Sequence, residues 1–307
     1  MAAIELEGLT KDYGDVLAAD DLTLRVETGE IFGYLGPNGA GKTTTIRMLL
    51  GFISPTAGTA QVLGSDIRDR KALIDARRRI GYLSDEPGFD EQATGTEVLE
   101  LHADVKGDDR SAELLELFDP PLERKVRDYS RGNVQKLGLV TTFMHDPDLV
   151  ILDEPTSGLD PLMKQRFSDF LRAEQQRGVT VFFSSHVLSE VRRLCDRVGI
   201  IRGGRLVTIE PVETLLKRSG KVVRINSAVP IPLETLDLEG VHDLETGSTD
   251  VDGVDPAVEF TECAFTFTGD INELLAHLPE SDLLDLSIEE APLEDVFMRF
   301  YGGEHDV

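Results

Sequence analysis

The sequence predicts an α/β fold in which a largely parallel sheet is covered by helices on both faces. Two observations support this prediction. Short apolar runs that are typical of buried strands alternate with helical patterns along the first 220 residues. One of these strands, Ile31–Leu35, leads into a glycine-rich loop at Gly36–Thr44, and the residues after it, Thr44–Leu50, are typical of a helix.

The loop fits the pattern G-x-x-x-x-G-K-[ST] at every fixed position, which a glycine-rich turn with a chance lysine would not explain. Its glycines let the backbone curl so that N–H groups point at phosphate oxygens, and the following helix adds partial positive charge. Lys42 would reach the β- and γ-phosphates, and the Thr43 hydroxyl would ligate Mg²⁺. The sequence therefore predicts a P-loop fold with a nucleoside triphosphate site formed by Gly36, Pro37, Asn38, Gly39, Ala40, Gly41, Lys42, Thr43 and Thr44.

The other elements of the first 220 residues follow from the same patterns. Residues 96–144 are helical, interrupted at Asp119-Pro120-Pro121, and are expected to form an insertion beside the sheet. Gly203-Gly204-Arg205 predicts a hairpin turn into a last strand at 206–209. The remaining expected elements are strands at 4–6, 22–26, 60–63, 80–83, 149–152, 179–183 and 198–201, a turn at 54–58 and a basic helix at 72–79.

A domain boundary is expected near Gly220. Residues 1–220 would form the nucleotide-binding domain, with a helical subdomain at about 86–145, and residues 221–307 a small acidic α/β accessory domain. In the tail, strands are expected at 222–225, 264–267 and 283–288, helices at 270–278 and 292–301, and a mobile loop rich in Gly, Asp, Ser and Thr at 245–256.

Composition indicates a soluble globular protein, with 307 residues of which 40% are hydrophobic and 29% charged. No stretch approaches the ~20 apolar residues of a membrane-spanning helix, and the start lacks the features of a secretory signal. The two cysteines, Cys195 and Cys263, are far apart and are expected to be buried hydrophobes instead of a disulfide. We therefore expect a cytosolic protein.

The net charge of −26 is concentrated at one end. From Lys221 onward there are three basic and 21 acidic residues. Such a surface disfavours electrostatic binding to DNA, RNA or bare membrane. Arginine outnumbers lysine 22 to 9, and an acidic, lysine-poor surface suits a cytoplasm of high salt concentration. An acidic accessory domain without any adaptation to salt is the alternative.

An apolar strand ending in two carboxylates lies at Asp148–Pro155. Beside a phosphate loop, Asp153 at the strand end can hold Mg²⁺ through its water shell. Glu154 is placed to accept a proton from an attacking water. A pair of solvated acids at a turn is common, but four apolar residues before the pair and the loop upstream favour the functional interpretation.

Two further motifs follow, Ser157-Gly158-Leu159-Asp160 and Ser184-Ser185-His186. His186 comes after an apolar strand, at the end where ligands bind in open α/β sheets, so it is a candidate for a hydrogen bond to the γ-phosphate. A lone histidine is more often structural or solvated, and only the neighbouring motifs favour this role.

Together these segments resemble the ATP-binding subunit of an ABC transporter over about residues 4–217. The resemblance implies that Asp160 contacts nucleotide and that the family's signature, usually Leu-Ser-Gly-Gly-Gln, corresponds to Tyr129-Ser130-Arg131-Gly132-Asn133. Ser130 and Gly132 match positions that cap the γ-phosphate from the partner subunit. Arg131 and Asn133, in the same nucleotide-binding segment, depart from the consensus.

Two more positions are carried over from the family. Tyr13 lies where the family places the aromatic residue that stacks on adenine, although a core or surface tyrosine is the alternative. Asp85 lies where the family has a Gln that contacts Mg²⁺ and links the nucleotide to the helical block. A carboxylate can still bind the water shell of Mg²⁺, but it cannot donate a hydrogen bond as an amide does.

The resemblance implies ATP hydrolysis at two composite sites of a head-to-tail dimer with a second ATP-binding subunit. In each site MgATP would be held by Lys42, Thr43 and Asp153 of one subunit and by Ser130 and Gly132 of the other. Glu154 would activate the attacking water, and His186 would help to orient it. Dimer closure would drive separate membrane permease subunits, with this chain peripheral on the cytoplasmic face of the cell membrane.

The ending at 291–298 resembles ATPases that serve exporters of drugs, antibiotics or sodium ions. The alternative is an ABC-type ATPase that acts on ribosomes or DNA. Those resembling translation factors carry two ATPase halves, and DNA-repair members carry a long coiled coil, whereas this chain has one half and no such insertion. A phosphate-loop kinase would leave Ser130–Asn133 and His186 unexplained.

Overall fold

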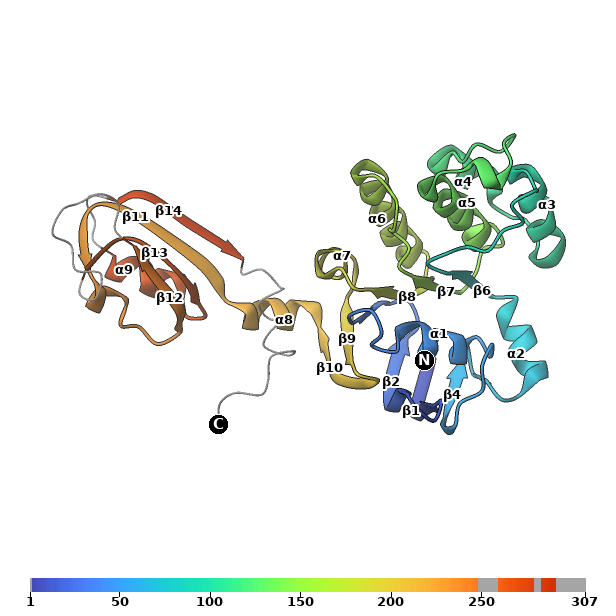
Figure 1. Cartoon of the computed structure of the whole chain (residues 1–307), viewed down its shortest axis with the longest axis horizontal. Helices are drawn as coiled ribbons and strands as arrows, with labels where there is room; N and C mark the ends of the chain where they lie inside the picture. Colours follow the sequence, from blue (N-terminus) through green and yellow to red (C-terminus); the bar gives the residue numbers. More distant parts are fainter. Residues whose placement is uncertain (1, 248–258, 279–282, 291–307) are drawn as a thin grey trace. The chain divides into compact units, whose positions relative to one another are not determined.

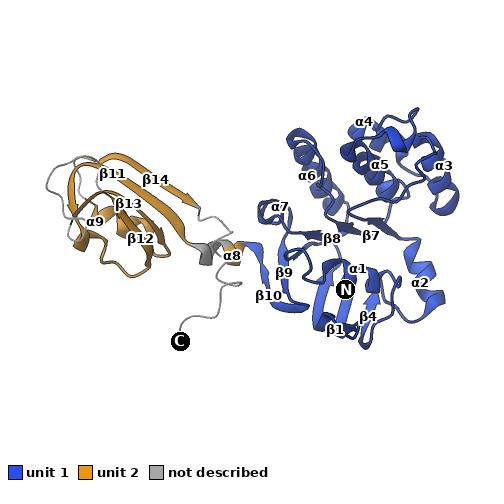
Figure 2. Cartoon of the chain, in the orientation of Figure 1, with its two compact units in different colours: residues 1–212 blue, residues 213–307 orange. Residues whose placement is uncertain are grey.

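The computed structural model describes residues 2–247, 259–278 and 283–290 (Figure 1). The chain divides into two compact units, residues 1–212 and 213–307 (Figure 2). Helix α8 (Val212–Ser219) begins where the second unit begins, and the predicted boundary near Gly220 falls at the end of this helix. The predicted terminal helix at 292–301 lies outside the described residues.

The central sheet of the first unit is largely parallel, as predicted. Among the described residues it has six strands in the order β10-β9-β3-β8-β7-β6, with only β10 antiparallel to its neighbour. Every residue of β3, β7 and β8 is buried, which explains the apolar runs at 31–35, 149–152 and 181–183. The strands span Ile31–Leu35 (β3), Ile80–Leu83 (β6), Leu149–Asp153 (β7), Thr180–Ser185 (β8), Arg197–Arg202 (β9) and Arg205–Pro211 (β10).

A second, antiparallel sheet covers one side of helix α1 (Lys42–Leu49), and the central sheet covers the other. Ile46, Met48 and Leu49 of α1 are fully buried in a core to which both sheets contribute. Alternation of buried and exposed side chains in β2 reflects a sheet with one face on this core. The strands pair in the order β2-β1-β4-β5 and span Ala2–Asp12 (β1), Leu17–Glu27 (β2), Ala57–Val62 (β4) and Ser65–Asp66 (β5).

Helices α6 (Pro161–Gln176) and α7 (Leu188–Leu194) lie on the opposite face of the central sheet (Figure 1). Asp160 caps the start of α6, because its side chain accepts a hydrogen bond from the Met163 amide at 2.9 Å. Helix α2 (Arg70–Arg77) begins two residues before its predicted start, because Asp69 caps it through Lys71 N and Ala72 N.

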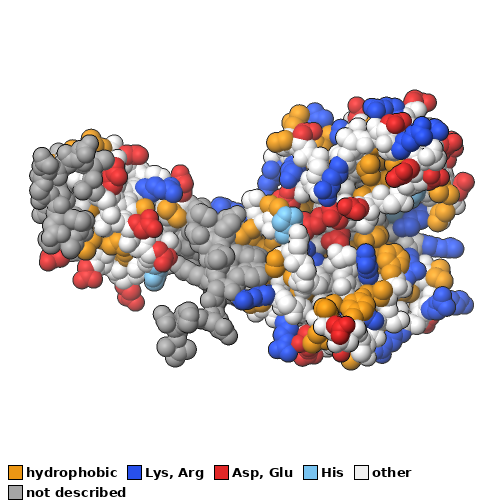
Figure 3. Space-filling model, in the orientation of Figure 1, with side chains coloured by type: hydrophobic (Ala, Val, Ile, Leu, Met, Phe, Trp, Pro, Cys, Tyr) orange, Lys and Arg blue, Asp and Glu red, His pale blue; other side chains and the backbone are white. Residues whose placement is uncertain are grey.

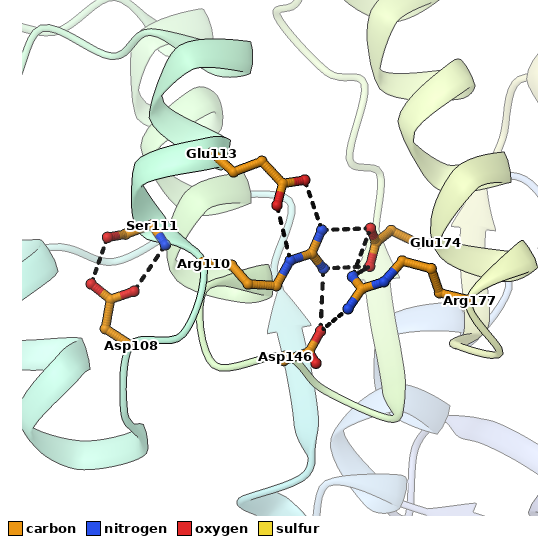
Figure 4. A network of polar contacts seen from close by, with 7 residues as sticks. All are labelled: Asp108, Arg110, Ser111, Glu113, Asp146, Glu174 and Arg177. Atoms are coloured by element: carbon orange, nitrogen blue, oxygen red, sulfur yellow. Dashed lines mark hydrogen bonds and ion pairs between the residues drawn. The ribbon is translucent and has the colours of Figure 1, made fainter.

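The helical block is formed by α3 (Gly95–Lys106), α4 (Ser111–Phe118) and α5 (Arg131–Phe143), with a short 3₁₀ helix at Val126–Asp128. An ion-pair network, buried at Arg110 and Glu174, joins it to α6 (Figure 4). Arg110, directly before α4, contacts Glu174 of α6 at 2.7 Å and Asp146 of the loop before β7 at 3.3 Å. Arg177 contacts the same two carboxylates. The network therefore fixes the start of α4 against the end of α6.

The second unit is an antiparallel sheet with helix α9 (Ile271–His277) packed on one face. Strand β12 includes Glu245–Gly247, so the prediction of a loop from 245 onward was wrong there, and residues 248–258 lie outside the described part. In Figure 3 the charged side chains visible on the described part of this unit are mainly Asp and Glu, scattered among hydrophobic and other side chains. The strand order is β12-β13-β11-β14, with β11 at Lys221–Pro232, β12 at Val241–Gly247, β13 at Glu259–Phe267 and β14 at Leu283–Glu290, and a 3₁₀ helix lies at Leu233–Leu236.

Candidate nucleotide site

A cleft of about 340 Å³ lies at the carboxyl ends of β3, β6 and β7. The phosphate loop lines it, together with the start of β2. The residues that line it are Val16, Leu17, Ala18, Pro37, Asn38, Gly39, Gly41, Lys42, Thr43, Thr44, Asp85, Asp153, Glu154 and Gly203. Most of the predicted phosphate loop is therefore present, together with three of the four predicted carboxylates, whereas Asp160 does not line the cleft.

Gly41 shows why the loop needs glycine. Its φ of 105° lies in the left-handed region, and a Cβ at this position would come within 2.1 Å of the Ala18 carbonyl oxygen. Helix α1 begins at the next residue with no side-chain cap and no acidic residue in its first turn. Its first N–H groups thus face the cleft with the positive end of the helix dipole, which suits an anion.

Lys42 is almost fully buried, and its ammonium group lies among oxygen atoms. Nζ donates hydrogen bonds to the Gly36 and Pro37 carbonyl oxygens at 2.6 and 3.3 Å and forms an ion pair with Glu154 Oε1 at 3.3 Å. The loop therefore folds around its own lysine, and the charge of Lys42 is held at the cleft.

Asp153 ends strand β7 and joins the loop to the neighbouring strand. Thr43 Oγ1 donates to Asp153 Oδ2 at 2.8 Å, and Ser184 Oγ donates to Oδ1 at 2.9 Å. Burial raises the pKa of Asp153 above its ordinary value, although the hydrogen bonds from Thr43 and Ser184 lower it. The hydroxyl and the carboxylate predicted to serve Mg²⁺ are thus side by side.

Glu154 lies between a cation and a histidine. Its Oε1 faces Lys42, and its Oε2 lies 2.9 Å from His186 Nδ1. The backbone of Glu154 has φ 51°, which is unusual for a residue with a side chain, and its N–H donates to the Ser184 carbonyl oxygen at 3.0 Å. His186 is half exposed, so its ring is open to solvent while it contacts Glu154.

The signature segment lies at the start of α5 and does not line the cleft. Ser130 caps the helix by accepting from the Asn133 amide at 3.3 Å, and a Cβ on Gly132 would come within 2.7 Å of the Gly158 carbonyl oxygen. The first turn of α5 therefore lies directly on the loop that leads to Asp160. Arg131 forms an ion pair with Asp85 at 2.9 Å.

Tyr13 is exposed in the turn between β1 and β2, with the Lys11 ammonium 5.0 Å from its ring centre. It does not line the cleft, whereas the nearby Val16 and the first two residues of β2, Leu17 and Ala18, do. The stacking of Tyr13 on adenine stays a prediction.

Three residues around the site were missed in the sequence. Gln135 is buried and donates to the Pro155 carbonyl oxygen at 2.9 Å. Ser184 bonds Asp153, and Glu190 accepts from Thr156 at 2.6 Å. Ser184 lies inside a motif quoted for its histidine, and Gln135 follows the signature, but only the strand order brings them to this place.

The donor set fits Mg²⁺ bound together with phosphate oxygens. Among the residues that the structure describes, no group of three or more His, Cys, Asp or Glu side chains could hold a metal ion on its own. One carboxylate and one hydroxyl in contact, beside a helix N-terminus, match the way Mg²⁺ binds with few protein ligands and substrate phosphates.

Comparisons with known proteins agree with this geometry. The family model described as ABC transporter matches residues 19–157. The bacitracin transport ATP-binding protein BcrA of Bacillus licheniformis is 36% identical over 98% of this chain and 97% of its own length. The Nod factor export ATP-binding protein I of Neorhizobium galegae is 33% identical over 98% and 86%. A solved structure of an ATP-binding subunit of an ABC transporter, 30% identical, has a TM-score of 0.64 and covers 70% of this chain and 92% of that one.

The fold and the cleft define a P-loop ATPase, as predicted. The chain belongs to the ABC transporter family, and it is an ATP-binding, ATP-hydrolysing subunit of that family. Within the described residues, no helix combines the length and the apolar character that crossing a membrane requires.

Proposed function

We propose that this chain hydrolyses MgATP with Glu154 as general base and drives export through separate membrane permease subunits. The observation that carries the proposal is the position of Glu154. Its carboxylate lies 3.3 Å from Lys42 and 2.9 Å from His186, one residue after the carboxylate that contacts Thr43. The proposed base, Glu154, thus lies beside the lysine that would contact the γ-phosphate. The pair that would hold Mg²⁺, Thr43 and Asp153, lies next to them.

In the proposed mechanism, the phosphate loop and Lys42 bind the β- and γ-phosphates, and Thr43 and Asp153 hold Mg²⁺. Bound Mg²⁺ would neutralise charge on the phosphate oxygens. Lys42 would then exchange its contact with Glu154 for phosphate, which frees the carboxylate to take a proton from water. His186, held by Glu154 through Nδ1, would present its other ring nitrogen toward the γ-phosphate.

We further propose that a second ATP-binding subunit completes each site. Ser130 and Gly132 do not line the cleft of their own chain, which fits contacts made across a head-to-tail dimer. Closure would exclude water other than the nucleophile, and hydrolysis would release the dimer. A Ser130→Arg variant should bind nucleotide as a monomer but fail to dimerise with MgATP.

The relatives support transport out of the cell. One is named for bacitracin transport and the other for Nod factor export, and both align over 98% of this chain. We propose a peripheral position on the cytoplasmic face of the membrane, bound to the permease. Pull-down in detergent should recover a protein with several membrane spans, whereas recovery of ribosomes would favour the alternative.

The central experiment compares Glu154→Gln with Glu7→Gln, an exposed position on β1 that serves as a matched control. Glu154→Gln should retain MgATP binding and lower the turnover rate by about 100-fold or more. Glu7→Gln should behave as the unmodified chain. Turnover by Glu154→Gln at the unmodified rate would refute the role of the base, and unchanged ATP binding by Lys42→Ala would refute that of the loop.

A further inference from the structure

One carboxylate behind the cleft accepts from three separate segments of the first unit. Glu190, on α7, accepts from Thr156 Oγ1 at 2.6 Å, from Lys164 Nζ at 3.0 Å and from Ser185 Oγ at 3.2 Å. Its side chain is 12% exposed, and Thr156 and Ser185 are buried. Because hydrogen bonds to a buried charged group are strong, this carboxylate fixes the three segments relative to one another.

The segments that Glu190 joins carry the proposed catalytic groups. Thr156 is two residues after Glu154, and Ser185 directly precedes His186. Ser185 Oγ also accepts from the Val187 amide at 2.9 Å, so the turn that bears the histidine is held through this hydroxyl. The 2.9 Å contact of Glu154 with His186 therefore depends on two chain segments whose side chains meet at one carboxylate.

We propose that Glu190 is a positioning residue for ATP hydrolysis, which sets the relative placement of Glu154 and His186. The inference rests on the proposed function, since it assigns to Glu190 a role in aligning the base. The backbone of Glu154 needs such support because its φ of 51° is held only when the surroundings determine it.

A carboxylate is required at this place for a chemical reason. Glu190 Oε1 accepts from Thr156 and Lys164, and Oε2 accepts from Ser185. In glutamine one of these oxygens becomes an NH₂ group, which only donates. The amide nitrogen would then face one of two donors. It would face either the Lys164 ammonium or the Ser185 hydroxyl, and the hydrogen of that donor would lose its acceptor. The substitution keeps the shape of the side chain but changes its donor pattern and removes the negative charge that pairs with Lys164.

The test is steady-state ATP turnover and fluorescent-nucleotide binding by the full chain carrying Glu190→Gln. We expect the turnover rate to fall about tenfold or more, with KM and MgATP affinity within about twofold of the unmodified protein. Ser185→Ala, which removes the hydrogen bond to Glu190 and the one from the Val187 amide but leaves the carboxylate, should lower turnover about threefold. Glu7→Gln is the control for the loss of one negative charge.

A double variant separates positioning from general structural support. In a His186→Ala background, Glu190→Gln should lower turnover by less than about twofold further, because its effect is exerted through the same pair. Independent, multiplicative effects would overturn the inference. So would a parallel loss of thermal stability, MgATP affinity and turnover in both Glu190→Gln and Ser185→Ala.

The outcomes also separate this inference from the proposed function. If Glu154→Gln is inactive while Glu190→Gln turns over at the unmodified rate, only the role of Glu190 is refuted. If Glu154→Gln itself remains active, the assignment of the base is refuted, whatever Glu190→Gln does.

Discussion

Asp85 and Arg131 form an ion pair at 2.9 Å between the segment after β6 and the first turn of α5. Asp85 also lines the cleft. The family resemblance predicts that each of them departs from the family pattern at its own motif, Asp85 at a glutamine and Arg131 inside the signature. The link between the cleft and α5 is thus an ion pair.

This pair should make a small contribution to stability that depends on salt. Both side chains are about half exposed, so we expect a coupling of about 0.5 kcal/mol in a double-mutant cycle of Asp85→Asn and Arg131→Gln. The cycle is measured by thermal unfolding without nucleotide, at about 0.1 M and 1 M salt. The coupling should vanish at the higher concentration, and additive effects at the lower one would contradict the prediction.

The network around Arg110 should contribute far more. The hydrogen bonds to Glu174 raise the pKa of the Arg110 guanidinium, and both side chains are almost fully buried. Arg110→Ala leaves Glu174 with Arg177 alone, so we expect a loss of about 3 kcal/mol of unfolding free energy in urea titrations.

The control is Arg79→Ala, which removes an exposed ion pair with Asp148 and should cost about 0.5 kcal/mol. Equal effects of the two substitutions would show that the network in Figure 4 does not fix the helical block to α6.

His145 should make the protein less stable in mild acid. Burial, followed by the charge of Lys106, lowers the pKa of this histidine from its ordinary 6.5 to about 4. Below pH 6.5 the unfolded chain binds a proton that the folded chain does not, so the contribution, up to about 3 kcal/mol, is present above pH 6.5 and lost on acidification toward pH 4.

The measurement is unfolding free energy against pH for the unmodified chain and for His145→Phe, which cannot titrate at this position. The variant should show a shallower slope between pH 4 and 6.5. Identical slopes would show that His145 binds its proton equally well in both states.

Salt should stabilise the protein. The segment from Lys221 onward carries most of the net charge of −26. Its acidic groups repel one another at low ionic strength. Thermal unfolding in KCl from about 0.05 to 2 M should show a rising midpoint, because the Debye length falls to about 3 Å near 1 M. A midpoint that does not change would argue against adaptation to a salty cytoplasm.

The parallel core was predictable because its strands are apolar throughout and carry their functional residues at one end. Strands β3 and β6 have the predicted bounds, Asp153 ends a buried strand, and Glu154 and His186 each directly follow one. Such residues lie close together wherever adjacent parallel strands end side by side. Their positions at the ends of apolar strands were therefore enough to predict that they share one site.

Contacts that depend on strand order were not predictable. Neither the bond of Ser184 to Asp153 nor that of Gln135 to Pro155 follows from local sequence, because the partners come together only when β7 pairs with β8 and α5 packs beneath the loop. Strand β12 was taken in part for a loop since it is a largely polar edge strand in which the consecutive residues 242–245 are all exposed.

The left-handed backbone of Glu154 has a consequence for laboratory evolution of this chain. Glycine at that position would relax the main chain by about 1 kcal/mol, and asparagine by less. Selection for heat tolerance alone would therefore favour loss of glutamate at this position, and under the proposed mechanism such variants would no longer hydrolyse ATP.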